Sequence, residues 1–260
     1  MSRFDLSAPE SWHLSLHNFG SSLGVPKWLP VGVQPQDGHY VIASDKGPVH
    51  VASAKRWMHY RFGWDARVAR LFRHFAIDET MRLQPGDQVI DIGANVGEFS
   101  IGAADRGASV LAIEGDPVVF DCLTRNTAAH QAITARHALV WKAQEELTFY
   151  SAPAKADSSI FKPTSKQDVQ TIRQMAYPLD QLADGLDCID LIKCDAEGAE
   201  PEVLEGAAQV LARTQQIALD TGPEREGAET GEECERILKG HGFTVSHSQK
   251  GRKITFGRRM

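Results

Sequence analysis

The sequence contains few cysteines, and their spacing does not suit metal binding or disulfide pairing. Four cysteines occur in 260 residues, and no two of them form a C-x-x-C pair. This argues against a disulfide framework and against a structural zinc site. The four thiols are typical of a reduced, cytoplasmic protein, and we expect that location.

Long apolar runs and an excess of positive charge are also missing. No stretch approaches the roughly 18 to 20 apolar residues that a membrane span requires, so we expect no membrane association. The formal net charge of -6 argues against broad capture of nucleic acid, because such capture needs clustered lysines and arginines. A basic cluster near the C-terminus is interpreted as a solvated tail; it comprises Lys250, Arg252, Lys253, Arg258 and Arg259.

The chain is long enough for one large α/β domain with an appendage. From Leu83 onward, β-branched runs alternate with helical stretches, which predicts a mostly parallel sheet with helices on both faces. We expect strands at Gln88–Ile92, Ser109–Glu114, Thr134–Val140, Asp190–Asp195, Gln216–Asp220, Thr244–His247 and Lys253–Phe256. We expect helices at Val96–Arg106, Pro117–His130, Pro201–Arg213 and Glu229–His241. An extra strand is predicted at Leu147–Tyr150, before a polar loop over 152–170.

Residues 1–80 differ from the rest, because glycine and proline interrupt them and tryptophan and histidine are frequent. His39–Ser44 and Pro48–Ser53 alternate around a turn and predict a hairpin. Apolar residues recur at helical spacing over 54–75, with a break at Gly63. We interpret 1–80 as a cap or lid on the domain formed by 81–260. Its aromatic residues could also pack against a partner subunit, so the oligomeric state stays open.

The most informative segment is V-I-D-I-G-A-N-V-G-E-F-S, at residues 89–100. A buried strand ends at Asp91, a turn with Gly93 and Gly97 follows, and a helix starts, so a ligand can bind at the carboxyl edge of the sheet. The glycines let the backbone approach that ligand without an intervening Cβ. Asn95 could bind either the turn backbone or the ligand.

Two carboxylates at strand ends indicate the class of ligand. Asp91 stands where a dinucleotide site has its first glycine, and its charge would repel a pyrophosphate but attract the ammonium of an aminoacyl cofactor. Glu114 ends the next strand, where it can accept hydrogen bonds from both ribose hydroxyls. Together they favour S-adenosylmethionine over NAD. The alternative is that Asp91 only caps the turn and Glu114 is a solvated strand end.

Three motifs resemble the FkbM-type methyltransferases, a branch of the class I adenosylmethionine-dependent enzymes. They are V-I-D-I-G-A-N-V-G at 89–97, A-I-E-G-D-P at 112–117 and I-D-L-I-K-C-D-A-E-G-A-E-P-E-V-L-E-G at 189–206, and the resemblance covers about 61–256. It implies a seven-stranded Rossmann-like sheet, S-adenosylmethionine as the donor, and O-methylation of a hydroxyl on a sugar, polyketide or other metabolite. It also implies that the cofactor contacts Asp91, Gly93, Asn95, Gly97 and Glu114.

A second acidic group is expected at the same rim of the sheet. Asp195 ends the fourth predicted strand, Glu197 lies just beyond it, and Asp220 ends the fifth. Methyl transfer to a hydroxyl requires removal of a proton, so Asp195 could be a general base. Alternatively, Asp195 and Asp220 could hold a divalent cation such as Mg²⁺, or the carboxylates could pair with Lys193 and backbone amides. The candidate catalytic residues are therefore Asp195, Glu197 and Lys193.

These patterns favour an adenosylmethionine-dependent O-methyltransferase that acts on a small metabolite or a glycan. An N-methyltransferase for an amine or peptide is the alternative within the class, because a neutral amine can attack without a base. Two other classes remain open, a NAD-dependent oxidoreductase and a silent cofactor-binding protein.

Overall fold

The computed structural model describes residues 5–153, 158–162, 169–225, 227–249 and 251–259. Within these ranges, no helix is long and apolar enough to cross a membrane. The largest sheet has seven strands in the order β12-β13-β11-β10-β4-β5-β6. All of them run parallel except β13, which is antiparallel to both of its neighbours. This architecture is the class I methyltransferase fold that was expected.

The strands of this sheet follow the predicted β-branched runs closely. Their bounds are β4 (Gln88–Ile92), β5 (Ser109–Glu114), β6 (Ile133–His137), β10 (Ile189–Cys194), β11 (Thr214–Asp220), β12 (Thr244–His247) and β13 (Ile254–Arg258). Chain order reverses between β4 and β10, which are adjacent although the segment from β5 to β9 separates them in sequence. In open α/β sheets, ligands bind at such a switch point, at the carboxyl ends of the strands.

Helices cover both faces of the sheet, and β4 shows this directly. Ile90 and Ile92 pack into one buried cluster with helix residues such as Val203, whereas Val89 packs into a second cluster with Phe99. This alternation is what a strand buried on both faces requires. The helices are α3 (Glu98–Asp105), α4 (Pro117–Thr127), α5 (Leu179–Leu182), α6 (Glu200–Glu205), α7 (Ala208–Ala212) and α8 (Gly231–Gly240).

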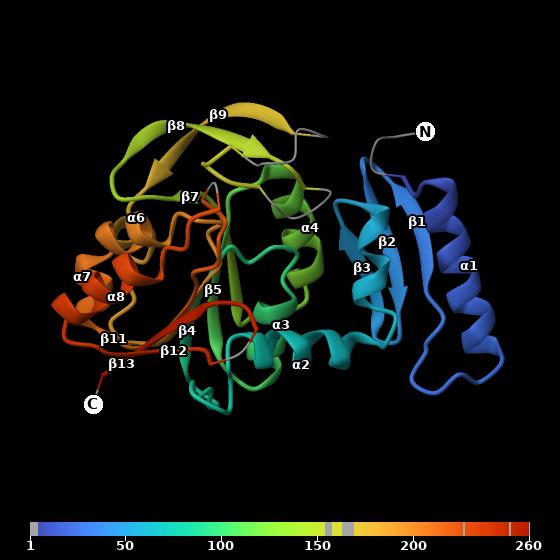
Figure 1. Cartoon of the computed structure of the whole chain (residues 1–260), viewed down its shortest axis with the longest axis horizontal. Coiled ribbons are helices and arrows are strands. Elements are labelled where there is room, and N and C mark those ends of the chain that lie inside the picture. Colours follow the sequence, from blue (N-terminus) through green and yellow to red (C-terminus); the bar gives the residue numbers. More distant parts are fainter. Residues whose placement is uncertain (1–4, 154–157, 163–168, 226, 250, 260) are drawn as a thin grey trace.

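Two predicted elements are divided in the structure. The helix predicted over 201–213 divides into α6 and α7 at Gly206, where a Cβ would lie 2.3 Å from the carbonyl oxygen of Trp141. The strand predicted over 134–140 divides because β7 (Leu139–Val140) leaves the central sheet. It pairs with β9 (Gln170–Tyr177), which in turn pairs with β8 (Glu145–Ser151). Figure 1 shows β8 and β9 above the central sheet.

The N-terminal region lies to the side of the central sheet, beyond α4 (Figure 1, blue). It comprises α1 (Ala8–Ser22), β1 (Gly32–Gln36), β2 (His39–Ser44), β3 (Gly47–Val51), the 3-10 helix η1 (Ala54–His59) and α2 (Trp64–His74). The predicted hairpin is confirmed as β2 and β3, and the predicted break at Gly63 separates η1 from α2. Apolar side chains including Trp57 and Tyr60 pack against Val96 and Val119.

The C-terminal basic cluster is not a solvated tail, which corrects the sequence interpretation. The Nε atom of Arg252 lies 2.7 Å from Oδ2 of Asp220. Arg259 donates hydrogen bonds to the carbonyl oxygens of Leu211, Thr214 and His241, and Arg258 belongs to β13. Lys250 lies outside the described residues. The sequence could not show these partners, because they come from distant segments.

Candidate active site

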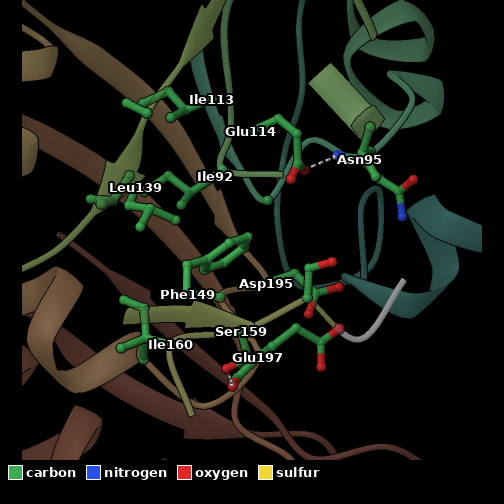
Figure 2. A pocket seen from close by; sticks show the side chains of 18 residues that line it. Ile92, Asn95, Ile113, Glu114, Leu139, Phe149, Ser159, Ile160, Asp195 and Glu197 are labelled. Carbon is green, nitrogen blue, oxygen red and sulfur yellow. Dashed lines mark hydrogen bonds between the residues drawn. The ribbon is translucent and has the colours of Figure 1, made fainter. Parts of the chain in front are cut away.

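A cavity lies at the carboxyl ends of β4, β5 and β10, where the order of the strands reverses. In Figure 2, the carboxylates of Glu114, Asp195 and Glu197 and the apolar side chains of Leu139 and Phe149 surround the same space. Further lining residues come from the turn after β4 and from the segment around Ser158; they include Gly93, Asn95, Ile113, Val119, Ser159 and Ile160. Within the described chain, this cavity combines acidic groups with a largely apolar wall.

Glu114 is buried at the end of β5, and backbone amides hold its carboxylate in place. Its Oε2 accepts a hydrogen bond from the backbone N–H of Asn95 at 2.9 Å, and its Oε1 accepts one from Asp116 at 2.8 Å. Burial raises the pKa of Glu114 to about 7, although these two amides and Lys193 lower it in part. The carboxyl group is therefore fixed in orientation and can change its charge near neutral pH.

The turn after β4 adopts the conformation that its glycines allow. Gly93, Asn95 and Gly97 all have positive φ, at 67°, 53° and 98°. A Cβ on Gly93 would lie 1.9 Å from the carbonyl oxygen of Asp195, so only glycine fits between β4 and the loop after β10. The Asn95 side chain accepts a hydrogen bond from the backbone N–H of Val96, and Asn95 also lines the cavity.

Asp91 lies outside the lining of the cavity, and a charged partner already holds its carboxylate. Its side chain is fully buried and it is not among the lining residues. Its Oδ1 lies 3.0 Å from Nζ of Lys193, and its Oδ2 accepts a hydrogen bond from the hydroxyl of Ser100 at 2.6 Å. The parallel register pairs Asp91 with Lys193, so the lysine already supplies the positive charge.

Lys193 has a structural role in this arrangement, in line with the alternative in which it pairs with carboxylates. Its ammonium donates hydrogen bonds to the carbonyl oxygens of Ile92 and Gly93, at 3.2 and 2.8 Å. Burial alone would lower the pKa of Lys193, but the carboxylates of Asp91 and Asp195 raise it above its usual value. The charged lysine therefore ties the end of β4 to β10 and shapes the turn beside the cavity.

Asp195 and Glu197 do line the cavity, on the loop that follows β10. The backbone N–H of Asp195 donates to the carbonyl oxygen of Ile92, whereas its side-chain Oδ1 has no hydrogen-bond partner among the described residues. Burial raises the pKa of Asp195; Lys193 opposes this shift and Asp220 adds to it. A carboxylate with a raised pKa and a free oxygen can accept a proton.

The metal pair proposed from the sequence, Asp195 and Asp220, is not supported by the geometry. Oδ2 of Asp220 already lies 2.9 Å from Nε2 of His74 and 2.7 Å from Nε of Arg252. Asp195 instead groups with Glu197 and Glu224, whose oxygens can lie within 4.8 Å of one another. Glu224 forms an ion pair with Arg252, and acidic groups of this kind are common without an ion.

Comparison with known proteins agrees with these features. The family model described as the methyltransferase FkbM domain matches residues 91–245, which include Glu114 and Asp195. The chain belongs to the FkbM methyltransferase family. FkbM methyltransferases are S-adenosylmethionine-dependent enzymes with the class I fold seen here, which excludes assignment to the NAD-dependent oxidoreductases.

Two curated relatives cover most of this FkbM methyltransferase. Methyltransferase sdnD of Sordaria araneosa is 28% identical over 200 residues, covering 62% of this chain and 75% of sdnD. The 31-O-demethyl-FK506 methyltransferase FkbM of Streptomyces tacrolimicus is 28% identical over 204 residues, covering 65% and 77%. Fibrillarin of Methanococcus jannaschii is a similar solved structure, with a TM-score of 0.48 and 15% identity over 88% of this chain and 97% of that one.

Sequence reasoning missed two buried acids that shape the site of this FkbM methyltransferase. Glu200 accepts hydrogen bonds from the backbone N–H groups of Ala196 and Gly198 and from the hydroxyl of Thr230, and burial raises its pKa to about 7. Asp116 accepts from the amides that begin α4 and from the hydroxyl of Ser158. Each acid directly precedes a proline at a helix start, and for Asp116 this signal could have indicated its role as the N-cap of α4.

A third missed acid, Glu98, joins the N-terminal region to the helix after the turn. Its Oε1 accepts hydrogen bonds from the hydroxyl of Tyr60 at 2.9 Å and from Nε of Arg67 at 3.0 Å. Burial alone would raise the pKa of Glu98, but Arg67 and Arg56 outweigh it and lower the pKa to about 2. The partners lie more than thirty positions upstream, so local patterns could not reveal them.

Proposed function

We propose that this FkbM methyltransferase binds S-adenosylmethionine in the cavity between Glu114 and Asp195. We further propose that it methylates a hydroxyl group of a small metabolite or a glycan. The observation that carries the proposal is the fixed, buried carboxylate of Glu114, which opens onto the same cavity as Asp195. Glu114 accepts hydrogen bonds from the two ribose hydroxyls, and the apolar wall with Ile113 and Leu139 receives the adenine.

The residues of the turn determine how the cofactor is oriented. Gly93 and Asn95 line the cavity between Glu114 and Asp195, so the methionine part lies along this turn. When bound, S-adenosylmethionine supplies a methyl group on a sulfonium, and transfer requires the acceptor oxygen in line at about 3 to 3.5 Å. Asp195 lies across the cavity from Glu114, at the end where the acceptor hydroxyl is placed in this proposal.

Asp195 acts as the general base in this proposal. As the acceptor oxygen forms its bond to the methyl carbon, the carbon–sulfur bond breaks and the hydroxyl proton moves to the carboxylate of Asp195. The cofactor would leave as a neutral thioether, and Asp195 would hold the proton that the acceptor loses. The raised pKa of Asp195 brings it closer to neutrality, where a base transfers protons most effectively.

A hydroxyl acceptor fits these residues better than an amine. An amine is already nucleophilic when neutral, whereas an alcohol needs a base such as Asp195. The name of the Streptomyces relative also describes a substrate that lacks a methyl group on an oxygen. N-methylation remains the alternative outcome of the test.

Transfer of labelled methyl groups tests the proposal. The protein is incubated with S-adenosylmethionine that carries ¹³C in its methyl group and with a metabolite extract, and the products are examined by NMR. The proposal predicts a methyl carbon attached to oxygen in an ether that resists mild base. A methyl carbon on nitrogen would support the alternative, and failure to bind S-adenosylhomocysteine would refute the cofactor site.

A further inference from the structure

A second cavity, of about 600 Å³, lies between the C-terminal half of α2 and the connection from β12 to β13. Because β12 is parallel to β11 and β13 is antiparallel to both, this connection lies at the carboxyl edge of the sheet. In Figure 1, the connection (red) approaches α2 and α3 (teal). The cavity is therefore at the same rim as the candidate active site.

Basic side chains outnumber acidic ones in the described lining of this cavity, although the whole chain carries a formal net charge of -6. Arg70, Arg73 and Arg252 all line it, together with His74 and His247. Among the described lining residues the acidic contribution comes from one side chain, that of Glu79. His74 pairs with Asp220, and His247 pairs with Glu235. An oxyanion would therefore meet mainly guanidinium donors here.

Two of these arginines have no carboxylate partner. Arg70 and Arg73 are exposed, and no described carboxylate lies within 4.0 Å of either guanidinium. Arg252 differs, because Asp220 and Glu224 pair with it. Arg70 and Arg73 are therefore available to bind a ligand, and Arg252 forms the side of the cavity that faces the active site.

Asp220 lies between the two cavities, although it is fully buried and lines neither of them. It ends β11, the strand next to β10, so it lies beside Asp195 at the strand ends. On the other side, its carboxylate holds both His74 and Arg252, which line the basic cavity. The basic cavity and the active site are therefore neighbours at one rim, and a molecule that reaches both must cross the group formed by Asp220, His74 and Arg252.

We propose that this basic cavity binds an oxyanion group of the methyl acceptor, a carboxylate, sulfate or phosphate. The proposal rests on the proposed function, because the acceptor hydroxyl must lie at Asp195. Planar guanidinium groups bind such oxyanions through paired hydrogen bonds, and Arg70 and Arg73 provide two of them. The acceptor is then an acidic hydroxylated molecule, such as a hydroxy acid or a phosphorylated or uronic sugar.

The test uses inorganic phosphate as the probe and the imidazole NMR signals of His74 and His247 as the readout. Phosphate is titrated into the protein saturated with S-adenosylhomocysteine. The pH is held constant, and sodium chloride keeps the ionic strength constant. The proposal predicts saturable shifts in the wild type. In the Arg70→Ala/Arg73→Ala variant, the affinity for phosphate falls by about tenfold or more, because two charge-assisted contacts are lost.

The matched control is Arg173→Ala/Arg236→Ala, which removes two exposed arginines on β9 and α8. It loses the same charge but should keep the phosphate affinity of the wild type. Shifts that stay linear in phosphate concentration, or equal affinities in the two double variants, would overturn the proposal and indicate an adventitious ion only.

Calorimetry with S-adenosylhomocysteine separates this outcome from failure of the proposed function. If S-adenosylhomocysteine binds normally but phosphate does not saturate, the oxyanion subsite alone is wrong. If S-adenosylhomocysteine does not bind, the proposed function fails and the subsite proposal fails with it.

Discussion

Replacing Glu114 with glutamine should weaken binding of S-adenosylhomocysteine by roughly 30- to 4000-fold at pH 8. Two charge-assisted hydrogen bonds from the ribose hydroxyls contribute about 1.5 to 3 kcal/mol each, and the amide retains about 1 kcal/mol of this. The remaining loss of roughly 2 to 5 kcal/mol gives the stated range. The amide also turns an NH₂ group toward one of the two backbone N–H groups, of Asn95 or Asp116, that the carboxylate now binds.

The pH dependence of this binding provides a second test of the same residue. Because burial raises the pKa of Glu114 to about 7, the carboxyl group is largely neutral below that pH in the free protein. The ribose hydroxyls need the ionised form as acceptor, so wild-type affinity should fall as pH drops below 7, approaching about tenfold per unit. The Glu114→Gln variant should show no such slope.

Isothermal titration calorimetry with S-adenosylhomocysteine between about pH 5.5 and 8 measures both effects. Circular dichroism of the variant at each pH confirms that it is folded. Variant affinity within about threefold of the wild type at pH 8, or a wild-type affinity that does not change with pH, would refute the role of Glu114.

Three further changes have distinct expected effects. Asp195→Asn should reduce turnover by about 10²- to 10⁴-fold with little change in S-adenosylhomocysteine affinity; equal turnover would remove Asp195 as the base. Gly93→Ala should abolish cofactor binding in calorimetry, because its Cβ would lie 1.9 Å from the Asp195 carbonyl oxygen, and normal affinity would contradict that close approach. Glu98→Gln should lower the free energy of unfolding in urea by about 3 to 5 kcal/mol, since Arg67 loses its buried partner. With its pKa lowered to about 2, Glu98 stabilises the wild type above pH 4.5, and this stabilisation is lost as pH falls. If the stability of the variant had the same pH dependence as that of the wild type, this role of Glu98 would be disproved.

The middle strands of the central sheet could be predicted from the sequence because they are buried on both faces. β4, β5 and β12 have the predicted bounds, and β4 and β5 are largely β-branched or apolar, with Asp91 interrupting β4. β9 was missed because half of its residues are exposed and its sequence lacks a sustained apolar pattern. α1 was missed for a similar reason, since its large apolar residues, including Trp12 and Phe19, are exposed and do not mark a buried face.

The site was predictable at the level of strand ends but not of charge partners. The sequence placed Glu114, Asp195 and Glu197 at one edge, and the structure brings them around one cavity. The sequence could not show that Lys193 neutralises Asp91, because this pairing depends on the register between β10 and β4. The charge argument from the sequence left out this lysine, and a contact between Asp91 and an ammonium stays a prediction.

A crystal structure of the protein with S-adenosylhomocysteine tests the central claim most directly. The account predicts that both ribose hydroxyls lie within hydrogen-bond distance of the Glu114 carboxylate and that the sulfur faces the Asp195 side of the cavity. A nucleoside bound elsewhere, or a sulfur pointing away from Asp195, would contradict it.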